Sequence, residues 1–369
     1  KRMARRRVPK MFFDYADSGA WTEQTYHANE SDFAKILLRQ RILVDMTDRN
    51  LATEMVGEPV SMPLALAPTG FCGMQHADGE ILAAQAAEAF GVPFCLSTMS
   101  ICSIEDVAAH TSKPFMFQLY VMRDRAFIEN LIDRAKAANC SALVLTLDLQ
   151  ILGQRHKDLR NGLSAPPKWT PKHAWQLATR PLWCLGMAKT KRHSFGNIVG
   201  HASNVGDLSS LSSWTKEQFD PRLSWDDVAW IKEKWGGKLI LKGILDPEDA
   251  RLSLDSGADA IIVSNHGGRQ LDGARSSIAA LPGIVDLTPG IRSLQIHFDP
   301  AVIARDVLLA NVQTAVAIPP KDRAKTTPLW VGCDGVDGWG AVALLAWLAA
   351  YLALIRFFLP RIRALSAGR

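Results

Sequence analysis

The sequence predicts an α/β fold with a parallel β-sheet, and three observations support that prediction. Short apolar runs alternate with helix-like segments along the first three quarters of the chain. The apolar runs are nearly uninterrupted, which is expected of strands that are buried on both faces. The chain has 369 residues, 48% hydrophobic and 21% charged, which excludes a largely disordered protein and suits a single (β/α)₈ barrel with an inserted loop.

Six strands and five helices are expected in alternation. The strands are the apolar runs that end in polar or small residues: 61–70, 93–98, 114–121, 142–148, 238–244 and 260–265. The helices are the segments with helical periodicity: 79–90, 103–110, 123–138, 225–235 and 247–256. Ser103 and Asp246 are residue types that cap helix N-termini, and Pro247 lies where the first turn tolerates proline. This alternation predicts parallel pairing.

One connection is much longer than the others. About ninety residues separate the fourth and fifth strands, and residues 150–224 contain eleven Lys or Arg against four Asp or Glu. The net charge of +5 is therefore concentrated in this basic insertion, which also contains Trp169, Trp175, Trp183 and Trp214. Basic residues mixed with tryptophans are typical of a membrane interface. The alternative is an ordinary surface loop whose tryptophans pack on the barrel.

The pattern weakens after Asp286. Residues 294–298 and 313–318 are candidate strands and 301–309 a candidate helix, whereas 319–328 are rich in proline and charge. Residues 339–355 form a run of seventeen uncharged residues, at the lower length limit for a membrane-spanning helix. A helix buried against the barrel is the alternative. We therefore expect a barrel at 1–286 that includes the insertion at 149–224, and a divergent segment at 287–369 with an apolar helix at 339–359.

The cysteines and the basic N-terminal residues exclude several classes of protein. The six cysteines are scattered, with no C-x-x-C pair and no cluster at metal-ligand spacing. We therefore expect no disulfide framework, no metal site and a reducing compartment. The basic residues 1–7 lack the long apolar core of a secretory signal, so no export signal is expected.

The strongest chemical signal is the motif SNHGGRQLD at residues 264–272, directly after the sixth expected strand. The carboxyl ends of barrel strands form the active face, so His266 and Arg269 are expected to lie there. Imidazole titrates near neutral pH and suits proton abstraction. A guanidinium group can hold a carboxylate with two parallel hydrogen bonds. An isolated loop histidine and a surface arginine would be the structural alternative.

Other strand ends supply matching groups. The fifth strand ends near Lys242, whose buried ammonium group requires an anion or a reduced cofactor opposite it. The fourth strand ends at Asp148 and is followed by Arg155, and the third ends with Gln118 and Tyr120. The convergence of these groups from consecutive strand ends favours a site over the structural alternative.

With these residues, the sequence resembles the FMN-dependent 2-hydroxy acid dehydrogenases and oxidases, most closely the bacterial membrane-associated L-lactate dehydrogenases. The resemblance extends from about residue 8 to 286. It includes the His266 segment and five further motifs: FDYADSGA (13–20), LRQRIL (38–43), ALAPTG (65–70), FQLYV (117–121) and KGILDPEDA (242–250). It implies a TIM-type barrel with a long insertion after strand four, either complete or altered at strands seven and eight.

The resemblance also implies a role for each candidate residue. His266 would take a proton from the substrate, and Asp148 would pair with the resulting imidazolium. Arg155 and Arg269 would bind the substrate carboxylate. The residues beside the substrate would be Tyr15 and Tyr120.

A further set of residues would contact the FMN. Lys242 would lie near the flavin ring and stabilise its anionic reduced form. The other positions that match flavin contacts are Ala67, Ser97, Gln118, Thr146 and Ser264. Beyond Asp286 the family's Asp-x-Gly-x-Arg and Gly-Arg segments, which hold the FMN phosphate, are missing. The segment PGIRS at 289–293 is similar to the first of them, but it follows Asp286 too closely to leave room for a strand.

These expectations define a function and a rival. The function is oxidation of L-lactate or a similar L-2-hydroxy acid to the 2-oxo acid through FMN, with electrons passed to a membrane quinone or another acceptor. The rival is a non-catalytic, flavin-poor remnant with a membrane-inserting C-terminal helix. We expect a location on the cytoplasmic side of the inner membrane, peripheral or anchored by the C-terminal helix. No nucleic-acid partner is expected, and self-association is left open.

Overall fold

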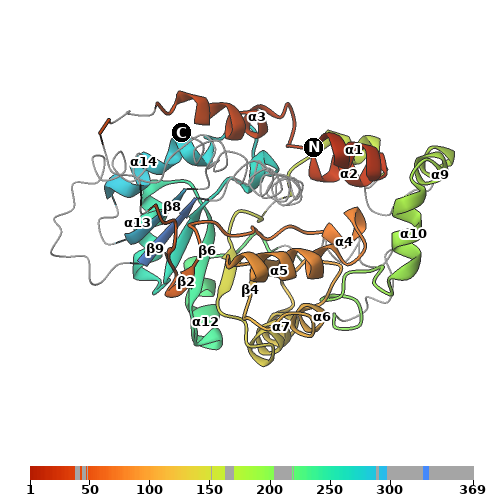
Figure 1. Cartoon of the computed structure of the whole chain (residues 1–369). Helices are drawn as coiled ribbons and strands as arrows, with labels where there is room; N and C mark the ends of the chain where they lie inside the picture. The colour runs from red at the N-terminus through yellow and green to blue at the C-terminus, as the bar shows by residue number, and fades with distance from the viewer. Residues whose placement is uncertain are drawn as a thin grey trace, which may run out of the picture.

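A computed structural model describes residues 1–37, 42–43, 47, 49–150, 152–162, 170–202, 218, 220–287, 291–296 and 327–331. The core of the molecule is a parallel sheet with the strand order β3-β4-β5-β6-β7-β9-β8 (Figure 1). Its strands are β3 (Cys95–Ser97), β4 (Met116–Tyr120), β5 (Leu143–Thr146), β6 (Leu239–Ile244), β7 (Ala260–Val263), β8 (Ile291–Ile296) and β9 (Thr327–Val331). Every residue of β3, β5 and β7 is buried, as expected of strands covered on both faces.

The second to sixth expected strands correspond to β3 to β7, which confirms the predicted parallel α/β class. The first expected strand, at 61–70, contributes one parallel bridge between Leu66 and Phe94. Within the described residues no ladder joins β8 to that segment, so the sheet does not close into a barrel there.

A two-stranded hairpin that the sequence analysis did not predict covers the amino-terminal end of the sheet. It consists of β1 (Thr53–Met55) and β2 (Glu58–Val60), joined by Val56 and Gly57 with φ of 49° and 76°. Two positive φ values match the tight hairpin turn, but Val-Gly is not the usual sequence for it. Met55, Val56 and Val60 pack against the first residues of the parallel strands.

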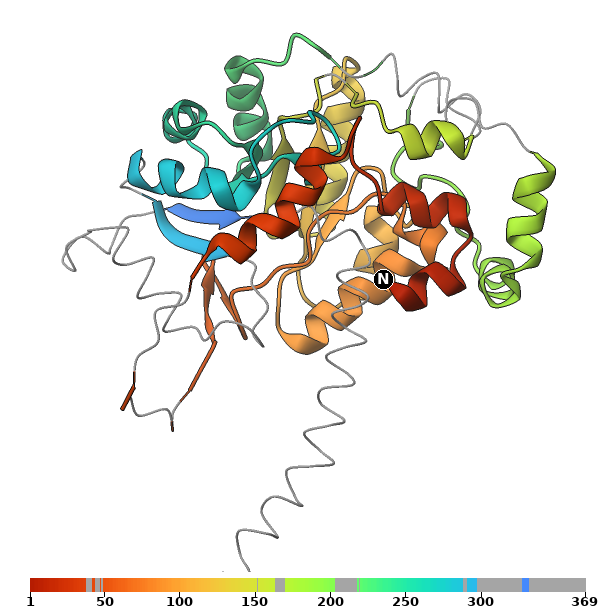
Figure 2. The ribbon, with the colours of Figure 1, turned by 90° about the horizontal axis from the view of Figure 1, so that it is seen from above.

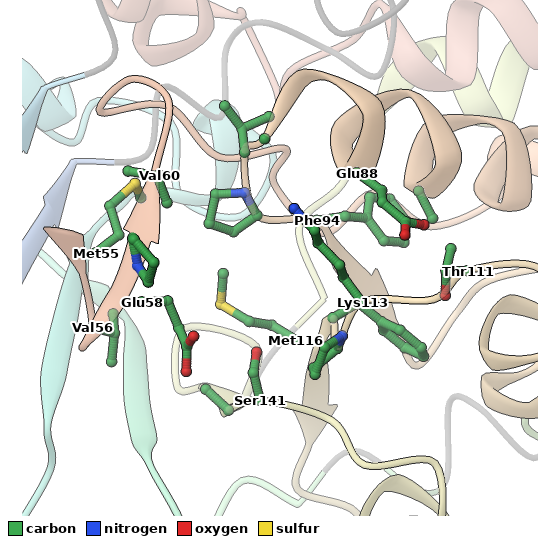
Figure 3. Close-up of a pocket in the computed structure, with 18 of the residues that line it drawn as sticks. Met55, Val56, Glu58, Val60, Glu88, Phe94, Thr111, Lys113, Met116 and Ser141 are labelled. Atoms are coloured by element: carbon green, nitrogen blue, oxygen red, sulfur yellow. The ribbon is translucent and has the colours of Figure 1, made fainter. Parts of the chain in front are cut away.

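A cavity of about 150 Å³ lies between this hairpin and the start of the sheet. Figure 3 shows Met55 and Val60 of the hairpin on one side and Phe94 and Lys113 on the other. None of the candidate site residues lines this cavity. It therefore lies at the opposite end of the strands from the expected site.

Five helices match the predicted ones: α5 (Gly79–Phe90), α6 (Ile104–Ala108), α7 (Arg125–Ala137), α12 (Trp225–Trp235) and α13 (Pro247–Asp255). The two predicted caps are present. Ser103 accepts a hydrogen bond from the Asp106 N–H at 3.0 Å, and Asp246 accepts one from the Glu248 N–H at 2.8 Å. The other helices are α1 (Arg2–Arg7), α2 (Lys10–Ala16), α3 (Gln24–Ser31), η1 (Asp32–Lys35), α4 (Cys72–Gln75), η2 (His266–Gly268) and α14 (Ser277–Leu287).

The described part of the basic insertion forms three helices: α8 (His156–Arg160), α9 (Pro171–Ala178) and α10 (Pro181–Lys189). Figure 1 and Figure 2 show α9 and α10 at one side of the molecule, beside α1 and α2. Trp183 packs against α2 and α4, because its ring stacks on Phe12 at 5.5 Å and its Nε1–H donates to the Met74 carbonyl at 2.9 Å. Trp175 is instead 72% exposed. The packing interpretation therefore holds for Trp183, whereas a membrane role for the exposed Trp175 stays a prediction, and Trp169 and Trp214 lie outside the described residues.

The described residues after Asp286 differ from a regular barrel continuation. β8 begins at Ile291, within the PGIRS segment at 289–293, and overlaps the predicted strand at 294–298. β9 lies between β7 and β8 and pairs in parallel with both. The candidate helix at 301–309, the candidate strand at 313–318 and the apolar helix at 339–359 lie outside the described residues. Within the described part of the chain, no helix is long and apolar enough to cross a membrane.

Candidate active site

A belt of buried polar side chains crosses the carboxyl ends of five adjacent strands. The Ser97 hydroxyl donates to the Gln118 amide oxygen at 3.0 Å, and the Gln118 amide nitrogen donates to the Thr146 hydroxyl at 2.9 Å. Lys242 lies beside Thr146 in register and donates to the Ser264 hydroxyl at 3.1 Å. All five side chains are buried. A buried ammonium group in this belt is costly unless an anionic or polar partner faces it.

His266 and Asp148 form a hydrogen-bonded pair beside this belt. Nδ1 of His266 lies 2.8 Å from Oδ1 of Asp148, and the Tyr120 ring stacks on the imidazole at 6.3 Å. Burial would raise the pKa of Asp148, but the charges of His266 and Lys242 outweigh burial and lower that pKa. The Asp148 carboxylate is therefore ionised near neutral pH and stabilises a protonated imidazole.

The backbone of the His266 loop is held in an unusual conformation. His266 has a φ of 58°, and the two following glycines also have positive φ. A Cβ at Gly268 would lie 2.4 Å from the Tyr26 nitrogen, so only glycine allows the loop to approach α3 this closely. Left-handed backbone at a histidine costs free energy, and the surrounding hydrogen bonds must hold it in place.

Two asparagines provide many of the hydrogen bonds that keep the His266 loop in this conformation. Asn29 on α3 and Asn265 exchange two amide hydrogen bonds, at 2.9 and 2.7 Å. The Asn265 amide also accepts from the Gly268 N–H at 3.0 Å and donates to the Arg275 carbonyl at 2.9 Å. Both side chains are buried. The pair therefore fixes the loop that carries His266 against the N-terminal region.

Arg155 and Arg269 both lie over the Tyr15 ring, with the guanidinium carbons 5.5 and 4.8 Å from its centre. Nη1 of Arg269 donates to the Tyr15 carbonyl at 2.6 Å and to the Ser18 carbonyl at 3.0 Å. A guanidinium has five N–H donors, so Nε and Nη2 of Arg269 keep three for a ligand. The two cations and Tyr15 together suit a small carboxylate.

Arg155 has a protein carboxylate as a partner. Its Nε donates to Oδ2 of Asp158 at 2.6 Å. Burial would lower the pKa of Arg155, but Asp158, Tyr15 and Tyr120 outweigh burial, so that pKa is raised. Arg155 therefore stays charged, and Asp158 orients it while leaving the two Nη groups for a ligand.

The structure brings the predicted site residues together at one end of the sheet. Tyr15 comes from α2, Arg155 immediately precedes α8, and the others come from β3 to β7 or the segments that follow them. Ala67 is exposed and follows Leu66, the bridging residue of the first expected strand. Sequence reasoning missed Ser18, Asp158 and the Asn29–Asn265 pair. Asp158 lies three residues after the predicted Arg155, whereas no local pattern marks Asn29.

These features define the class of protein. The chain matches the model of the FMN-dependent dehydrogenase family over residues 4–312, and it belongs to that family, whose cofactor is FMN.

Individual relatives agree with this membership. The chain is 49% identical over 288 residues to an L-lactate dehydrogenase of Haemophilus influenzae, covering 78% of this chain and 75% of that protein. It is 47% identical over 288 residues to an L-lactate dehydrogenase of Ectopseudomonas mendocina, covering 78% of this chain and 76% of that one. Among solved structures, the monotopic membrane protein (S)-mandelate dehydrogenase matches with a TM-score of 0.78 and 30% identity over 95% of this chain and 91% of that chain. The barrel fold predicted from the resemblance is thereby confirmed.

The polar belt fits the ring of FMN. The flavin's pyrimidine edge presents carbonyl oxygens and a ring N–H, and the belt offers the Lys242 ammonium, the Gln118 amide and hydroxyl groups. The family's phosphate contacts follow strands seven and eight, and the residues that follow β8 and β9 lie outside the described part of the chain. In that part, no group of His, Cys, Asp or Glu residues has an arrangement that could hold a metal ion.

Proposed function

We propose that this protein oxidises L-lactate or a similar L-2-hydroxy acid to the corresponding 2-oxo acid and passes the electrons to a membrane quinone or another acceptor. The observation that supports this most directly is the His266–Asp148 pair at 2.8 Å between the two arginines over Tyr15 and the Lys242 belt. A base, a carboxylate clamp and an electron-acceptor site are the three parts that this oxidation requires.

Each residue then has a defined task. Arg155 and Arg269 hold the substrate carboxylate and so orient its C2 carbon. His266 takes the hydroxyl proton at Nε2, because Nδ1 faces Asp148. The Asp148 carboxylate stabilises the imidazolium that results. FMN, when bound, supplies the acceptor for the two electrons that leave C2.

The flavin-facing residues complete the arrangement. We assign the FMN ring contacts to Ala67, Ser97, Gln118, Thr146 and Ser264. Lys242 places a positive charge beside the ring, where it favours added electrons. Tyr15 and Tyr120 line the substrate space. We further propose that residues 1–286 form most of the barrel unit and that β8 and β9 of the divergent segment 287–369 add two strands to its sheet.

We also propose peripheral attachment to the cytoplasmic side of the inner membrane through α9 and α10. Trp175, Leu182 and Leu185 on these helices are exposed, and Lys172 and Lys189 lie among them on the sequence. The four exposed arginines of α1 lie beside this surface, because Arg180 donates to the carbonyls of Val8 and Arg5. Indoles and basic side chains together suit an anionic lipid surface.

A spectrum and a turnover assay test the proposed oxidation. The protein is loaded with excess FMN and mixed with L-lactate and ferricyanide, a soluble acceptor that requires no membrane. We expect ferricyanide reduction with L-lactate and none with D-lactate. A protein that holds FMN yet reduces no ferricyanide with any L-2-hydroxy acid would support the non-catalytic remnant instead.

A further inference from the structure

Four exposed apolar side chains lie on segments that carry or adjoin residues of the candidate active site. Trp21 is 55% exposed, Leu152 43%, Leu159 49% and Leu271 69%. They lie on three segments: the loop before α3, the segment from β5 through α8, and the loop after η2. Exposed apolar groups scattered singly need no explanation, but a group of them around a site marks a binding surface.

Backbone and side-chain contacts bring the three segments together. The Trp21 N–H donates to the Gln154 carbonyl at 3.0 Å, and the indole meets the His156 ring edge-on at 5.6 Å. A Cβ at Gly153 would lie 2.1 Å from the Arg269 carbonyl, so the segment after Leu152 touches the one before Leu271. The Asp272 carboxylate accepts from the Thr22 N–H at 2.9 Å and fixes Leu271 near Trp21.

This apolar rim is continuous with the substrate site. Leu271 follows Arg269 by two residues, and His156 follows Arg155 directly. The rim is also joined to α9, because Nε2 of His173 lies 2.8 Å from the Asn161 carbonyl just after α8. Leu159 on α8 is thereby linked to the helices proposed to face the lipid.

Trp21 also has a strained backbone. Its φ is 47°, in the left-handed region that a bulky residue avoids and glycine adopts freely. A large, exposed aromatic side chain gains little stability at such a position. Strain that persists at the edge of a site is a reason to look for a function of that side chain.

We propose that Trp21, Leu152, Leu159 and Leu271 form the docking surface for a lipophilic quinone, which oxidises the enzyme after each turnover. The inference rests on the proposed function, because it names the surface that the second substrate uses. The indole of Trp21 offers a flat face to the quinone ring, and the leucines contact its apolar tail. The quinone takes up two electrons from the reduced enzyme and the two protons that oxidation of the hydroxy acid released, and it leaves as the quinol while the enzyme returns to its oxidised form.

Binding of ubiquinone-1, a soluble short-chain quinone, to the oxidised FMN-loaded protein tests this directly by titration calorimetry. Trp21→Gly and Leu271→Ser should each weaken binding about three- to tenfold, the loss expected for one aromatic or apolar contact. Leu254→Ser, an exposed leucine on α13, is the matched control and should leave the dissociation constant unchanged. Trp21→Gly should also keep or raise the Tm, because glycine relieves the positive φ.

Kinetics with two acceptors separate this inference from the proposed function. In Trp21→Gly the KM for ubiquinone-1 should rise while lactate turnover with ferricyanide stays at the wild-type rate. Undiminished ubiquinone-1 binding in both rim variants, or no binding by the wild-type protein, overturns the docking surface. Absence of lactate turnover with every acceptor would instead refute the proposed function. The ubiquinone-1 titration would then decide on the docking surface by itself.

Discussion

His266 combines a charged partner, an aromatic neighbour and a left-handed backbone, and each has a separate physical role. Asp148 supplies the charge that favours proton uptake, and Tyr120 covers one face of the ring. The backbone conformation places the imidazole at the end of β7, where Lys242 and the two arginines also converge. Substitutions of single residues in the site therefore test proton transfer to His266 and the orientation of its imidazole.

His266→Ala should reduce turnover of L-lactate by about 10²- to 10⁴-fold while the KM changes little, because general base catalysis acts in the chemical step. Steady-state kinetics with ferricyanide measure this. His193→Ala, an exposed histidine on the insertion, is the control. Activity of His266→Ala within about tenfold of wild type would show that another group is the base.

Arg269→Lys should raise the KM for L-lactate by about tenfold or more although the charge is kept, because an ammonium group cannot reproduce a planar two-bond clamp. The substitution also removes Nη1, which donates to the Tyr15 and Ser18 carbonyls. Nearly normal kinetics in this variant would assign the clamp to Arg155 alone.

Asn29→Ala should lower the kcat for L-lactate about tenfold and leave the KM within about threefold. The reason is that a small displacement of His266 slows proton transfer, whereas the residues that bind the substrate keep their positions. Asn29 touches the His266 loop through Asn265 and does not reach the substrate, so it is a positioning residue. Asn50→Ala, an exposed asparagine, is the control. An unchanged kcat in a folded Asn29→Ala protein would show that Asn29 does not position His266.

At the scale of elements, α9 and α10 each have two different faces. His173 and Gln176 are buried, and Gln176 accepts a hydrogen bond from the Met11 N–H at 2.9 Å, while Trp175 points outward. Deleting the insertion would therefore expose the core around Phe12 and Met74. Substitutions on the outer face test membrane attachment without this damage.

The combined variant Trp175→Ser, Leu182→Ser and Leu185→Ser should lose most binding to vesicles of phosphatidylcholine and phosphatidylglycerol, because three apolar groups no longer enter the interface. Flotation with vesicles measures the bound fraction. Leu82→Ser, an exposed leucine on α5, should bind as the wild type does. If the triple variant still bound the vesicles as the wild type does, the attachment site would instead be assigned to the apolar residues 339–355.

The ion pair between α6 and α7 predicts a pH dependence of stability. Two N–H groups of Arg134 reach the two Glu105 oxygens at 2.7 Å each, and these bonds lower the pKa of Glu105 to about 2. Because the folded pKa lies below the unfolded one, the stabilisation is present at neutral pH and decreases as pH falls below about 4.5. Glu105 is half exposed, so Glu105→Gln should cost about 1 kcal/mol or less at pH 7. Urea unfolding of both proteins should show that this difference narrows toward pH 4.

The helices could be predicted from the sequence because their signals are local. The repeat of apolar residues and the caps at Ser103 and Asp246 lie within each helix. The β1–β2 hairpin was missed because Val56 and Gly57 lack the usual turn residues. Asn29 and Asn265 are 236 positions apart, so only the folded chain shows their contact.

At the scale of the whole molecule, the site divides into a part that faces the flavin ring and a part that must hold its phosphate. Residues 327–331 form β9, which pairs with β7. Its position between β7 and β8 could not be predicted, because strand order depends on contacts far apart in sequence. In the sequence, β9 leads into GCDGVDG, whose Asp334 and Asp337 would repel a phosphate.

We therefore predict weak FMN binding. Loss of two or three charge-assisted hydrogen bonds, each worth about 1.5 to 3 kcal/mol, would raise the dissociation constant by several orders of magnitude. Replacing the residues after Asp286 with the corresponding segment of the Haemophilus influenzae L-lactate dehydrogenase should restore tight binding, measured by equilibrium dialysis. Tight, stoichiometric FMN in the unmodified protein would show that its own C-terminal residues hold the phosphate.

Anaerobic mixing of the FMN-loaded protein with L-lactate tests the central claim most directly, because it isolates electron transfer from the substrate. We expect the flavin absorbance to bleach with L-lactate and to persist with D-lactate, and we expect His266→Ala to slow the bleaching by at least about 10²-fold. A protein with bound FMN whose absorbance is unchanged by L-lactate and by other L-2-hydroxy acids would contradict this claim.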